Sequence, residues 1–201
     1  MASTICHKVI LIGNSSVGKT SIISQFVYGT SSANQKTTVG IDYFIKSITV
    51  GDKTATLQIW DTAGQEKFHS LIPSYMRDST VALLTFDITS KTTFEDLRKW
   101  HQMILNSTKV FVIGNKIDLE FDRQVTREEG EEFAKEIDAL YFETSARDGT
   151  GVNEMFEKIP SIPLPQINDE QTQKSGNESD TIVIKLNDEK QSNNTDSRCY
   201  C

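Results

Sequence analysis

The sequence contains few cysteines, few prolines and no excess of basic side chains. Its 201 residues include three cysteines and four prolines, and 28 acidic side chains outnumber 21 basic ones. Three cysteines, two of them within the last three positions, are too few for the disulfide framework of a small secreted scaffold. The net charge of −7 argues against a nucleic-acid partner, because a phosphate backbone attracts a basic surface.

Long apolar runs are missing as well. No run approaches the roughly 20 residues that a membrane-spanning helix needs, and the opening sequence, MASTICHK, lacks the apolar core of a signal peptide. We therefore expect an intracellular protein, with Cys6 as a small core residue of the first strand. A hydrophobic content of 37% is sufficient for one folded domain.

Short apolar runs alternate with stretches of helical periodicity. Strands are predicted at residues 7–13, 47–50, 54–60, 80–88, 109–115 and 139–145. Capping-box patterns at Thr92 with Glu95 and at Thr126 with Glu129 predict two helix starts. Only three residues join the second and third strands, so these two form an antiparallel hairpin, whereas helical crossovers connect the others. The sequence therefore predicts an α/β fold: a doubly wound, mainly parallel six-stranded sheet with one antiparallel strand, helices on both faces and a ligand site at the carboxyl ends of the strands.

The composition changes at Pro160. Residues 160–180 are rich in proline, serine and other polar residues and show no period, so they cannot bury enough surface to fold alone. We predict a folded domain over residues 1–159 and a flexible tail over residues 160–201. Within this tail, residues 181–186, TIVIKL, are either a mobile segment or an apolar patch that docks on a partner.

A glycine-rich loop, residues 13–20 with the sequence GNSSVGKT, follows the first predicted strand. It matches the pattern G-x-x-x-x-G-K-[ST], in which backbone N–H groups surround phosphate oxygens at the start of a helix. Lys19 would reach the β- and γ-phosphates, and the Thr20 hydroxyl would bind Mg²⁺. The predicted phosphate-binding residues of this loop are Gly13, Ser15, Ser16, Val17, Gly18, Lys19 and Thr20. A kinase, an ATPase and a switch GTPase all share such a loop, and a purely structural turn is the remaining alternative.

Three further candidate residues lie at or just after the end of the third predicted strand. The carboxylate of Asp61 could reach the water shell of the same Mg²⁺, although a strand-terminal aspartate is also a common helix cap. The N–H of Gly64 could donate to the γ-phosphate. Gln65 could orient a water molecule for in-line attack, which makes it the predicted catalytic residue.

The sequence NKID at residues 115–118 points to the base. A carboxylate such as Asp118 can accept hydrogen bonds from the N1–H and the 2-amino group of guanine, a pair that adenine does not offer. A loop-capping Asn and Asp are the alternative interpretation of so short a motif. A further motif, ETSAR at residues 143–147, follows the last strand, where the Ala146 N–H could meet the guanine O6. The predicted guanine-binding residues are Asn115, Lys116, Asp118, Ser145, Ala146 and Arg147.

These four motifs, in this order, resemble those of the Rab family of small GTPases, which are P-loop NTPases, and the resemblance covers residues 5–158. Residues 37–44, TTVGIDYF, are similar to switch I of that family, which implies that Thr38 binds Mg²⁺ and senses the γ-phosphate. Residues 60–68, WDTAGQEKF, are similar to switch II. Residues 70–89 are especially similar to the Golgi-associated branch of the family.

The resemblance implies a mechanism and a set of partners. Bound GTP and Mg²⁺ would hold both switches, and slow hydrolysis to GDP and phosphate would release them, faster when a GTPase-activating protein inserts an arginine. A monomer of this kind would also bind an exchange factor, a prenyl-binding escort or dissociation inhibitor, and effectors of vesicle-mediated traffic. Two other classes remain open: a P-loop kinase or ATPase, and an interaction module with a Rab-like fold that binds nucleotide poorly.

The sequence ends in CYC, which is similar to the C-x-C that Rab proteins carry for double geranylgeranylation, here of Cys199 and Cys201. Residues 160–201 contain seven acidic and four basic side chains, so anionic lipids do not attract them. Anchoring without a basic patch requires two lipid chains, and the alternative is a pair of idle exposed cysteines. We expect the protein on the cytoplasmic face of Golgi or vesicle membranes, cycling with the cytosol.

Two departures from the family pattern concern the base. Ser31 occupies the position where the family usually places an aromatic residue over the guanine. We therefore expect faster GDP release than from a typical Rab protein, unless Tyr28 or Phe26 takes over the stacking. Arg147 replaces the usual lysine of the last motif, which matters little if the alanine N–H makes the main contact.

Two other departures shorten helices. The span between Trp100 and Asn115 is several residues shorter than usual in the family, so the helix after Thr92 or its exit loop must be cut back. Pro160 should end the last helix early, because its ring lacks an N–H and clashes with the preceding turn. Both changes concern stability and affinity more than identity.

Overall fold

The computed structural model describes residues 5–30, 41–62 and 72–164, all within the unit Met1–Gln166. No helix in these ranges is long and apolar enough to cross a membrane. The predicted boundary between residues 159 and 160 stays a prediction.

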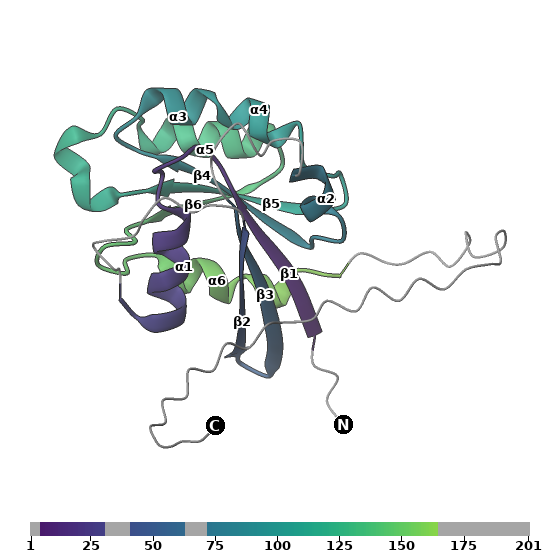
Figure 1. The fold of residues 1–201 in the computed structure, drawn as a ribbon. Helices are drawn as coiled ribbons and strands as arrows, with labels where there is room; N and C mark the ends of the chain where they lie inside the picture. The colour runs from purple at the N-terminus through teal and green to yellow at the C-terminus, as the bar shows by residue number, and fades with distance from the viewer. Residues whose placement is uncertain (1–4, 31–40, 63–71, 165–201) are drawn as a thin grey trace, which may run out of the picture. The chain divides into compact units, whose positions relative to one another are not determined.

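Six strands form one sheet in the order β2-β3-β1-β4-β5-β6 (Figure 1). The strands are β1 (Ile5–Ile12), β2 (Ile41–Val50), β3 (Lys53–Thr62), β4 (Val81–Asp87), β5 (Lys109–Asn115) and β6 (Leu140–Thr144). β2 and β3 form the antiparallel hairpin, and every other pair of neighbouring strands is parallel. The doubly wound sheet with one antiparallel strand confirms the fold predicted from the sequence.

Helices cover both faces of this sheet. They are α1 (Lys19–Tyr28), α2 (Ile72–Met76), α3 (Lys91–Glu95), α4 (Leu97–His101), α5 (Arg127–Glu136) and α6 (Val152–Glu157), with the 3₁₀ helices η2 (Ile117–Asp122) and η3 (Ile159–Ser161). Figure 1 shows α1 and α6 on one face and α3, α4 and α5 on the other. β1 contributes to both hydrophobic cores, Val9 and Leu11 to one and Ile10 and Ile12 to the other. Its continuous apolar run is explained by burial on both sides.

The capping box predicted at the start of α5 is confirmed. The Thr126 hydroxyl accepts a hydrogen bond from the Glu129 N–H at 3.2 Å, and the Glu129 carboxylate accepts one from the Thr126 N–H at 2.9 Å. Two backbone donors that the helix itself leaves unpaired are thereby satisfied. The sequence pattern alone was sufficient here because all of its partners lie within one turn.

The capping box predicted at Thr92 and Glu95 is wrong. α3 begins directly after Ser90, which serves as its N-cap. The Thr93 hydroxyl donates to the Ser90 carbonyl at 2.8 Å and accepts from the Asp87 N–H at 3.1 Å. This hydroxyl closes the turn between β4 and α3, so the helix starts before the predicted pair.

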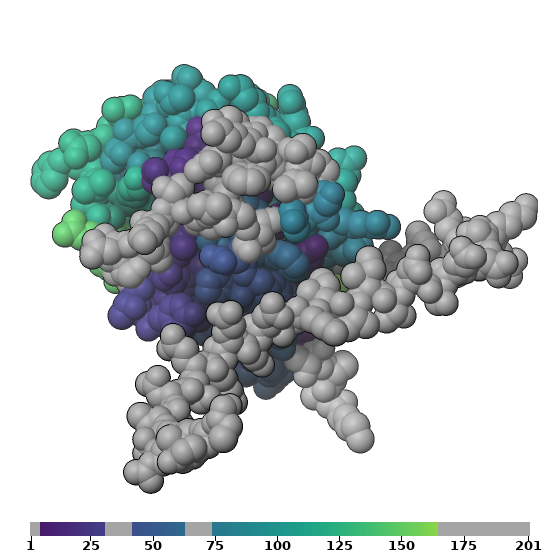
Figure 2. Space-filling view, in the orientation of Figure 1, coloured from purple at the N-terminus to yellow at the C-terminus, as the bar shows by residue number. Residues whose placement is uncertain are grey.

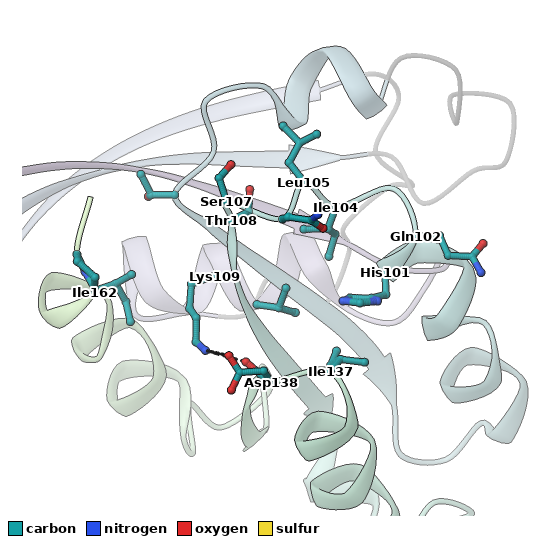
Figure 3. Close-up of a pocket in the computed structure, with 14 residues that line it drawn as sticks. His101, Gln102, Ile104, Leu105, Ser107, Thr108, Lys109, Ile137, Asp138 and Ile162 are labelled. Atoms are coloured by element: carbon teal, nitrogen blue, oxygen red, sulfur yellow. Dashed lines mark hydrogen bonds and ion pairs between the residues drawn. The ribbon is translucent and has the colours of Figure 1, made fainter. Parts of the chain in front are cut away.

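The helical region after β4 is short, as the span that follows Trp100 predicts. α4 ends at His101, and residues 102–108 turn towards β5. A hollow of about 830 Å³ lies beside this turn and the start of β5 (Figure 3). At its rim the Lys109 ammonium group donates to the Asp138 carbonyl oxygen at 2.7 Å. The turn between α4 and β5 therefore borders open space.

The last helix ends early, as predicted from Pro160. α6 stops at Glu157, and Pro160 lies in η3, which continues the chain with a tighter turn. Ile159 and Pro160 are buried, and Ile159 packs in the same core as α1 and α6. The chain therefore remains anchored to the domain beyond the end of α6.

Cys6 is exposed, which contradicts the expectation of a core residue. β4 pairs with β1 only from Val9 onwards, so the start of β1 lies at the margin of the sheet.

The neighbouring His7 is 0% exposed. Its Nδ1 lies 3.3 Å from the Thr80 hydroxyl, and its Nε2 has no hydrogen-bond partner among the described residues. Burial lowers the pKa of this imidazole below its ordinary value.

We expect the protein to lose stability as the pH falls from 7.0 to 5.5. The unfolded chain takes up a proton on His7 near the ordinary pKa of about 6.5, whereas the folded state keeps the imidazole neutral to a lower pH. The free energy of unfolding then falls by up to about 1.4 kcal/mol per pH unit. Urea denaturation at both values measures this loss, which should shrink in a His7→Leu variant. An equal loss in the variant would assign the pH dependence to other groups.

Candidate functional site

The loop between β1 and α1 is curved tightly enough to surround an anion. Three of its residues have a positive φ: Gly13 (140°), Ser16 (64°) and Gly18 (99°). A Cβ at Gly13 would lie 2.1 Å from the Thr85 carbonyl oxygen, and one at Gly18 would lie 2.3 Å from Asn115 Nδ2. Backbone turns of this kind form concave anion-binding loops. The remaining predicted loop residues are the exposed Ser15 and the buried Val17.

The Lys19 ammonium group lies inside this loop. Its Nζ donates to the carbonyl oxygens of Gly13 and Asn14, both at 2.8 Å, and the residue is 5% exposed. Burial lowers the pKa of Lys19 to about 8, although the nearby Asp61 carboxylate acts to raise it. A cation that is costly to bury gains from an anionic ligand, so the loop fits a phosphate group.

Thr20 and Asp61 meet beside the loop. Asp61 lies at the carboxyl end of β3, where the parallel register places it opposite Leu11 of β1, and it is 0% exposed. The Thr20 hydroxyl, in the first turn of α1, donates to Asp61 Oδ2 at 2.5 Å. A hydroxyl and a carboxylate are hard oxygen donors of the kind that Mg²⁺ prefers, so these two residues fit the predicted ion.

Asn115 joins the phosphate loop to the segments predicted around the base. Its Nδ2 donates to the Val17 carbonyl oxygen at 2.8 Å. Its Oδ1 accepts from the Thr144 hydroxyl at 3.1 Å and from the Ala146 N–H at 3.2 Å. The residue is 1% exposed. Asn115, at the end of β5, therefore connects two other chain segments, the phosphate loop and residues 144–146, and the Ala146 N–H predicted for guanine O6 is held at the same junction.

Asp118 is fixed beside this junction. The Ser145 hydroxyl donates to Asp118 Oδ1 at 2.8 Å, and the Arg147 guanidinium lies 3.7 Å from Asp118 Oδ2. Lys116 turns the chain before η2 with a φ of 73°, and its Nζ lies 2.6 Å from Asp87 Oδ2. The structure therefore brings together the residues predicted to bind guanine, at the carboxyl ends of β5 and β6.

Asp87 and Asn14 are two residues of this edge that the sequence does not single out. Asp87 ends β4 and accepts hydrogen bonds from the Thr89 N–H at 2.9 Å and the Thr89 hydroxyl at 2.7 Å, besides its ion pair with Lys116. Its place at the carboxyl end of a buried strand is a signal that could have revealed it. Asn14 bonds to residues more than 80 positions away, which no local pattern indicates.

Several predicted residues lie outside the described ranges, and their roles stay predictions. They are Ser31, Thr38, Gly64, Gln65, Cys199 and Cys201. The apolar segment 181–186 also lies outside these ranges. The described part of the site therefore comprises the phosphate loop, the Thr20 and Asp61 pair and the base-side residues.

One of the two substitutes for the missing aromatic residue is excluded by the structure. Phe26 is 5% exposed, and its ring stacks on Phe156 with a centroid distance of 3.8 Å. Lys46 Nζ lies 4.1 Å from the centroid of the Phe26 ring. Phe26 is thus committed to the core, whereas Tyr28 is 66% exposed at the end of α1.

We expect a Ser31→Phe variant to release GDP more slowly than the natural protein. An aromatic ring stacked on the base contributes about 1–3 kcal/mol, which corresponds to a dissociation rate lower by about fivefold to 150-fold. The rate can be measured by chasing a fluorescent GDP analogue with unlabelled GDP. Ser31→Leu is the control for added apolar volume. An unchanged rate in Ser31→Phe would show that the position does not reach the base.

The doubly wound sheet, with a glycine-rich phosphate loop between its central strand and the following helix, defines a P-loop NTPase. Residues 8–162 match the model of the Ras family. Because this match covers most of the chain, the protein belongs to the Ras family. Members of this family are small GTPases that bind GTP and GDP together with Mg²⁺.

Proposed function

We propose that the protein is a Rab-type small GTPase, which alternates between GTP-bound and GDP-bound states and regulates vesicle-mediated traffic at Golgi membranes. One observation supports the nucleotide specificity: the loop cation Lys19 and the carboxylate Asp118 lie at one edge of the sheet, where the Asn115 side chain bonds the phosphate loop at Val17 and the segment at Ala146, and Ser145 of that segment donates to Asp118. A ligand that satisfies both groups needs phosphate at one end and paired N–H donors at the other. Guanine nucleotides provide both, whereas ATP lacks the paired donors.

The proposed reaction is slow hydrolysis of GTP. A water molecule oriented by Gln65 attacks the γ-phosphorus, the bond to the bridging β-phosphate oxygen breaks, and GDP and phosphate leave. Lys19 would stabilise charge on the phosphates, while Thr20 and Asp61 would hold Mg²⁺. Mg²⁺, when bound, neutralises charge on the phosphate oxygens. A GTPase-activating protein that inserts an arginine is expected to raise the rate by about 10³ to 10⁵.

An exposed apolar surface on β2 supports a role in partner binding. Tyr43 and Ile45 of this edge strand are 45% and 61% exposed. The Tyr43 ring packs edge-on against Trp60 with a centroid distance of 4.9 Å, so its position is fixed before a partner arrives. Figure 2 shows the β2 and β3 hairpin in blue on the face turned to the viewer. We place effectors, the exchange factor and the dissociation inhibitor on this surface and the two switches.

The first test is the identity of the bound nucleotide. The protein is purified with Mg²⁺ and denatured, and the released nucleotide is identified by ion-exchange chromatography. Near-stoichiometric GDP or GTP is the expected result. Released ATP or ADP would favour the kinase or ATPase class, and an empty protein that takes up no added GTP would favour the interaction module.

The second test concerns the lipid anchor, which distinguishes the Rab-type proposal from other small GTPases. We propose that Cys199 and Cys201 both carry geranylgeranyl groups, which the acidic tail and the CYC ending support. Intact-mass spectrometry after expression in a eukaryotic cell should show two such groups, one in each single Cys→Ser variant and none in the double variant. One lipid or none on the natural chain would contradict this part of the proposal.

A further inference from the structure

The side chain of Asn14 connects the phosphate loop to the junction between α3 and α4. Its Oδ1 accepts a hydrogen bond from Trp100 Nε1 at 2.6 Å, and its Nδ2 donates to Asp96 Oδ2 at 2.7 Å. Asn14 is the second residue of the loop, whereas Asp96 lies between the two helices and Trp100 lies within α4. Asp96 and Trp100 together form an anchor for this one amide group, which bonds to them through both its acceptor and its donor side.

The anchor itself is rigid. Trp100 is 4% exposed and packs in the core that includes Ile10 and Ile12 of β1. Arg98 of α4 forms a two-pronged ion pair with Glu136 of α5, at 2.5 and 2.7 Å. Hydrogen bonds from Lys99 and Asn14 hold the pKa of Asp96 below its ordinary value, so this carboxylate is charged at neutral pH. A bond from an amide N–H to a charged carboxylate is stronger than a neutral one.

The main chain of Asn14 contacts the cation of the phosphate site. Its carbonyl oxygen accepts a hydrogen bond from Lys19 Nζ at 2.8 Å, and the other carbonyl acceptor of Lys19 belongs to Gly13, the preceding residue. A displacement of Asn14 therefore moves both carbonyl oxygens that hold Lys19. The side chain of Asn14 fixes this position against a separate layer of the fold.

We propose that Asn14 is a positioning residue for the phosphate loop, and that the α3 and α4 junction, through Asp96 and Trp100, sets the rate at which nucleotide dissociates. The inference rests on the proposed binding of guanine nucleotide at this loop. It assigns to Asn14 no contact with the nucleotide, because its side chain is bonded to the helices. It also connects the surface around Asp96 to the nucleotide site, through the side-chain hydrogen bond from Asn14 to Asp96 and the bond from Lys19 to the main-chain carbonyl of Asn14.

Dissociation of a fluorescent GDP analogue from four proteins tests the proposal. Asn14→Ala removes both side-chain bonds and is expected to release GDP about tenfold faster, and Trp100→Phe, which keeps a ring but loses the N–H, about fivefold faster. Lys99→Met is the matched control. It removes the other partner of Asp96, an exposed ion pair at 2.6 Å, and should change the rate by less than about twofold. Equal rates for Asn14→Ala and Lys99→Met would overturn the proposal.

The double variant Asn14→Ala with Trp100→Phe tests whether the two residues act together. Because they share one hydrogen bond, the double variant should release GDP about tenfold faster, like Asn14→Ala alone. A rate about 50-fold faster, the product of the two single effects, would show that the residues act independently and would contradict the proposed anchor.

Swapping the side chains of Asn14 and Asp96 distinguishes two effects on the rate of GDP release, that of loop position and that of local charge. Asn14→Asp alone places two carboxylates against each other and should give the fastest release. Combining it with Asp96→Asn restores an amide and carboxylate pair with the same local charge as in the natural protein. The combined variant should return to within about threefold of the natural rate. A combined variant as fast as Asn14→Asp would mean that negative charge near the phosphates, rather than loop position, controls release.

Failure of this inference can be distinguished from failure of the proposed function. A natural protein that binds no GDP would contradict the proposed function before any variant is compared. Hydrogen exchange of the loop amide groups, measured on the same four proteins, would then test the anchor by itself. Faster exchange in Asn14→Ala and Trp100→Phe than in Lys99→Met is the supporting result, and equal exchange in all four is the contradicting one.

Discussion

An Asp118→Asn variant should lose GDP affinity by a factor of about 10³ to 10⁵ and gain affinity for xanthosine diphosphate. The Asp118 carboxylate only accepts hydrogen bonds, which suits the N1–H and the 2-amino group of guanine. An asparagine side chain presents one acceptor and one donor instead. Xanthine, which carries a carbonyl oxygen in place of the 2-amino group, matches that arrangement.

The structure makes this substitution a clean test of base recognition. The Ser145 hydroxyl donates to Asp118 Oδ1 at 2.8 Å, and an asparagine Oδ1 can accept the same bond, so the local fold should be retained. Asp122→Asn, the same change at an exposed position of η2, is the matched control and should leave GDP affinity unaltered. Titration of both variants with the two nucleotides measures the effect. An Asp118→Asn variant that still prefers GDP would remove Asp118 from the base site.

A Gly13→Ala variant should be less stable by about 4 kcal/mol. Gly13 has a φ of 140°, which strains any residue with a side chain, and a Cβ there would lie 2.1 Å from the Thr85 carbonyl oxygen. That oxygen belongs to the backbone of β4, a strand paired with neighbours on both sides, so it cannot move aside cheaply. The cost is therefore the sum of backbone strain and a steric overlap.

Gly51→Ala is the control for a positive φ without a close contact. Gly51 also has a positive φ, 58°, but a Cβ there would meet nothing within 4 Å, so about 1 kcal/mol is expected. Urea denaturation in the presence of EDTA, after removal of nucleotide, keeps ligand binding out of the comparison. Equal losses in the two variants would show that the close approach of the loop to β4 does not contribute to stability.

Much of the fold could be predicted because its signals are local. The buried strands, the hairpin and the capping box at Thr126 each depend on residues within a few positions of one another. The phosphate loop and the NKID segment could be placed for a related reason, since each follows directly on an apolar strand. Parallel pairing then brings the carboxyl ends of those strands to one edge.

The errors arose where distant parts of the chain decide the outcome. Whether Cys6 or His7 faces the core depends on where β4 begins to pair with β1, and a single strand sequence does not state this. The start of α3 is set by the Thr93 hydroxyl and the end of β4 rather than by the pattern within the helix. The partners of Asn14 lie in helices that only the folded sheet brings to the loop.

The junction at Asn115 has a consequence for how the two ends of a nucleotide are held. Because one buried side chain bonds to the loop at Val17 and to the segment at Ala146, ordering either end reduces the freedom of the other. Guanine and pyrophosphate, offered as separate molecules, should therefore bind cooperatively, each strengthening the binding of the other without touching it. The ribose that links base and phosphates in GDP would add to a coupling that the protein already provides.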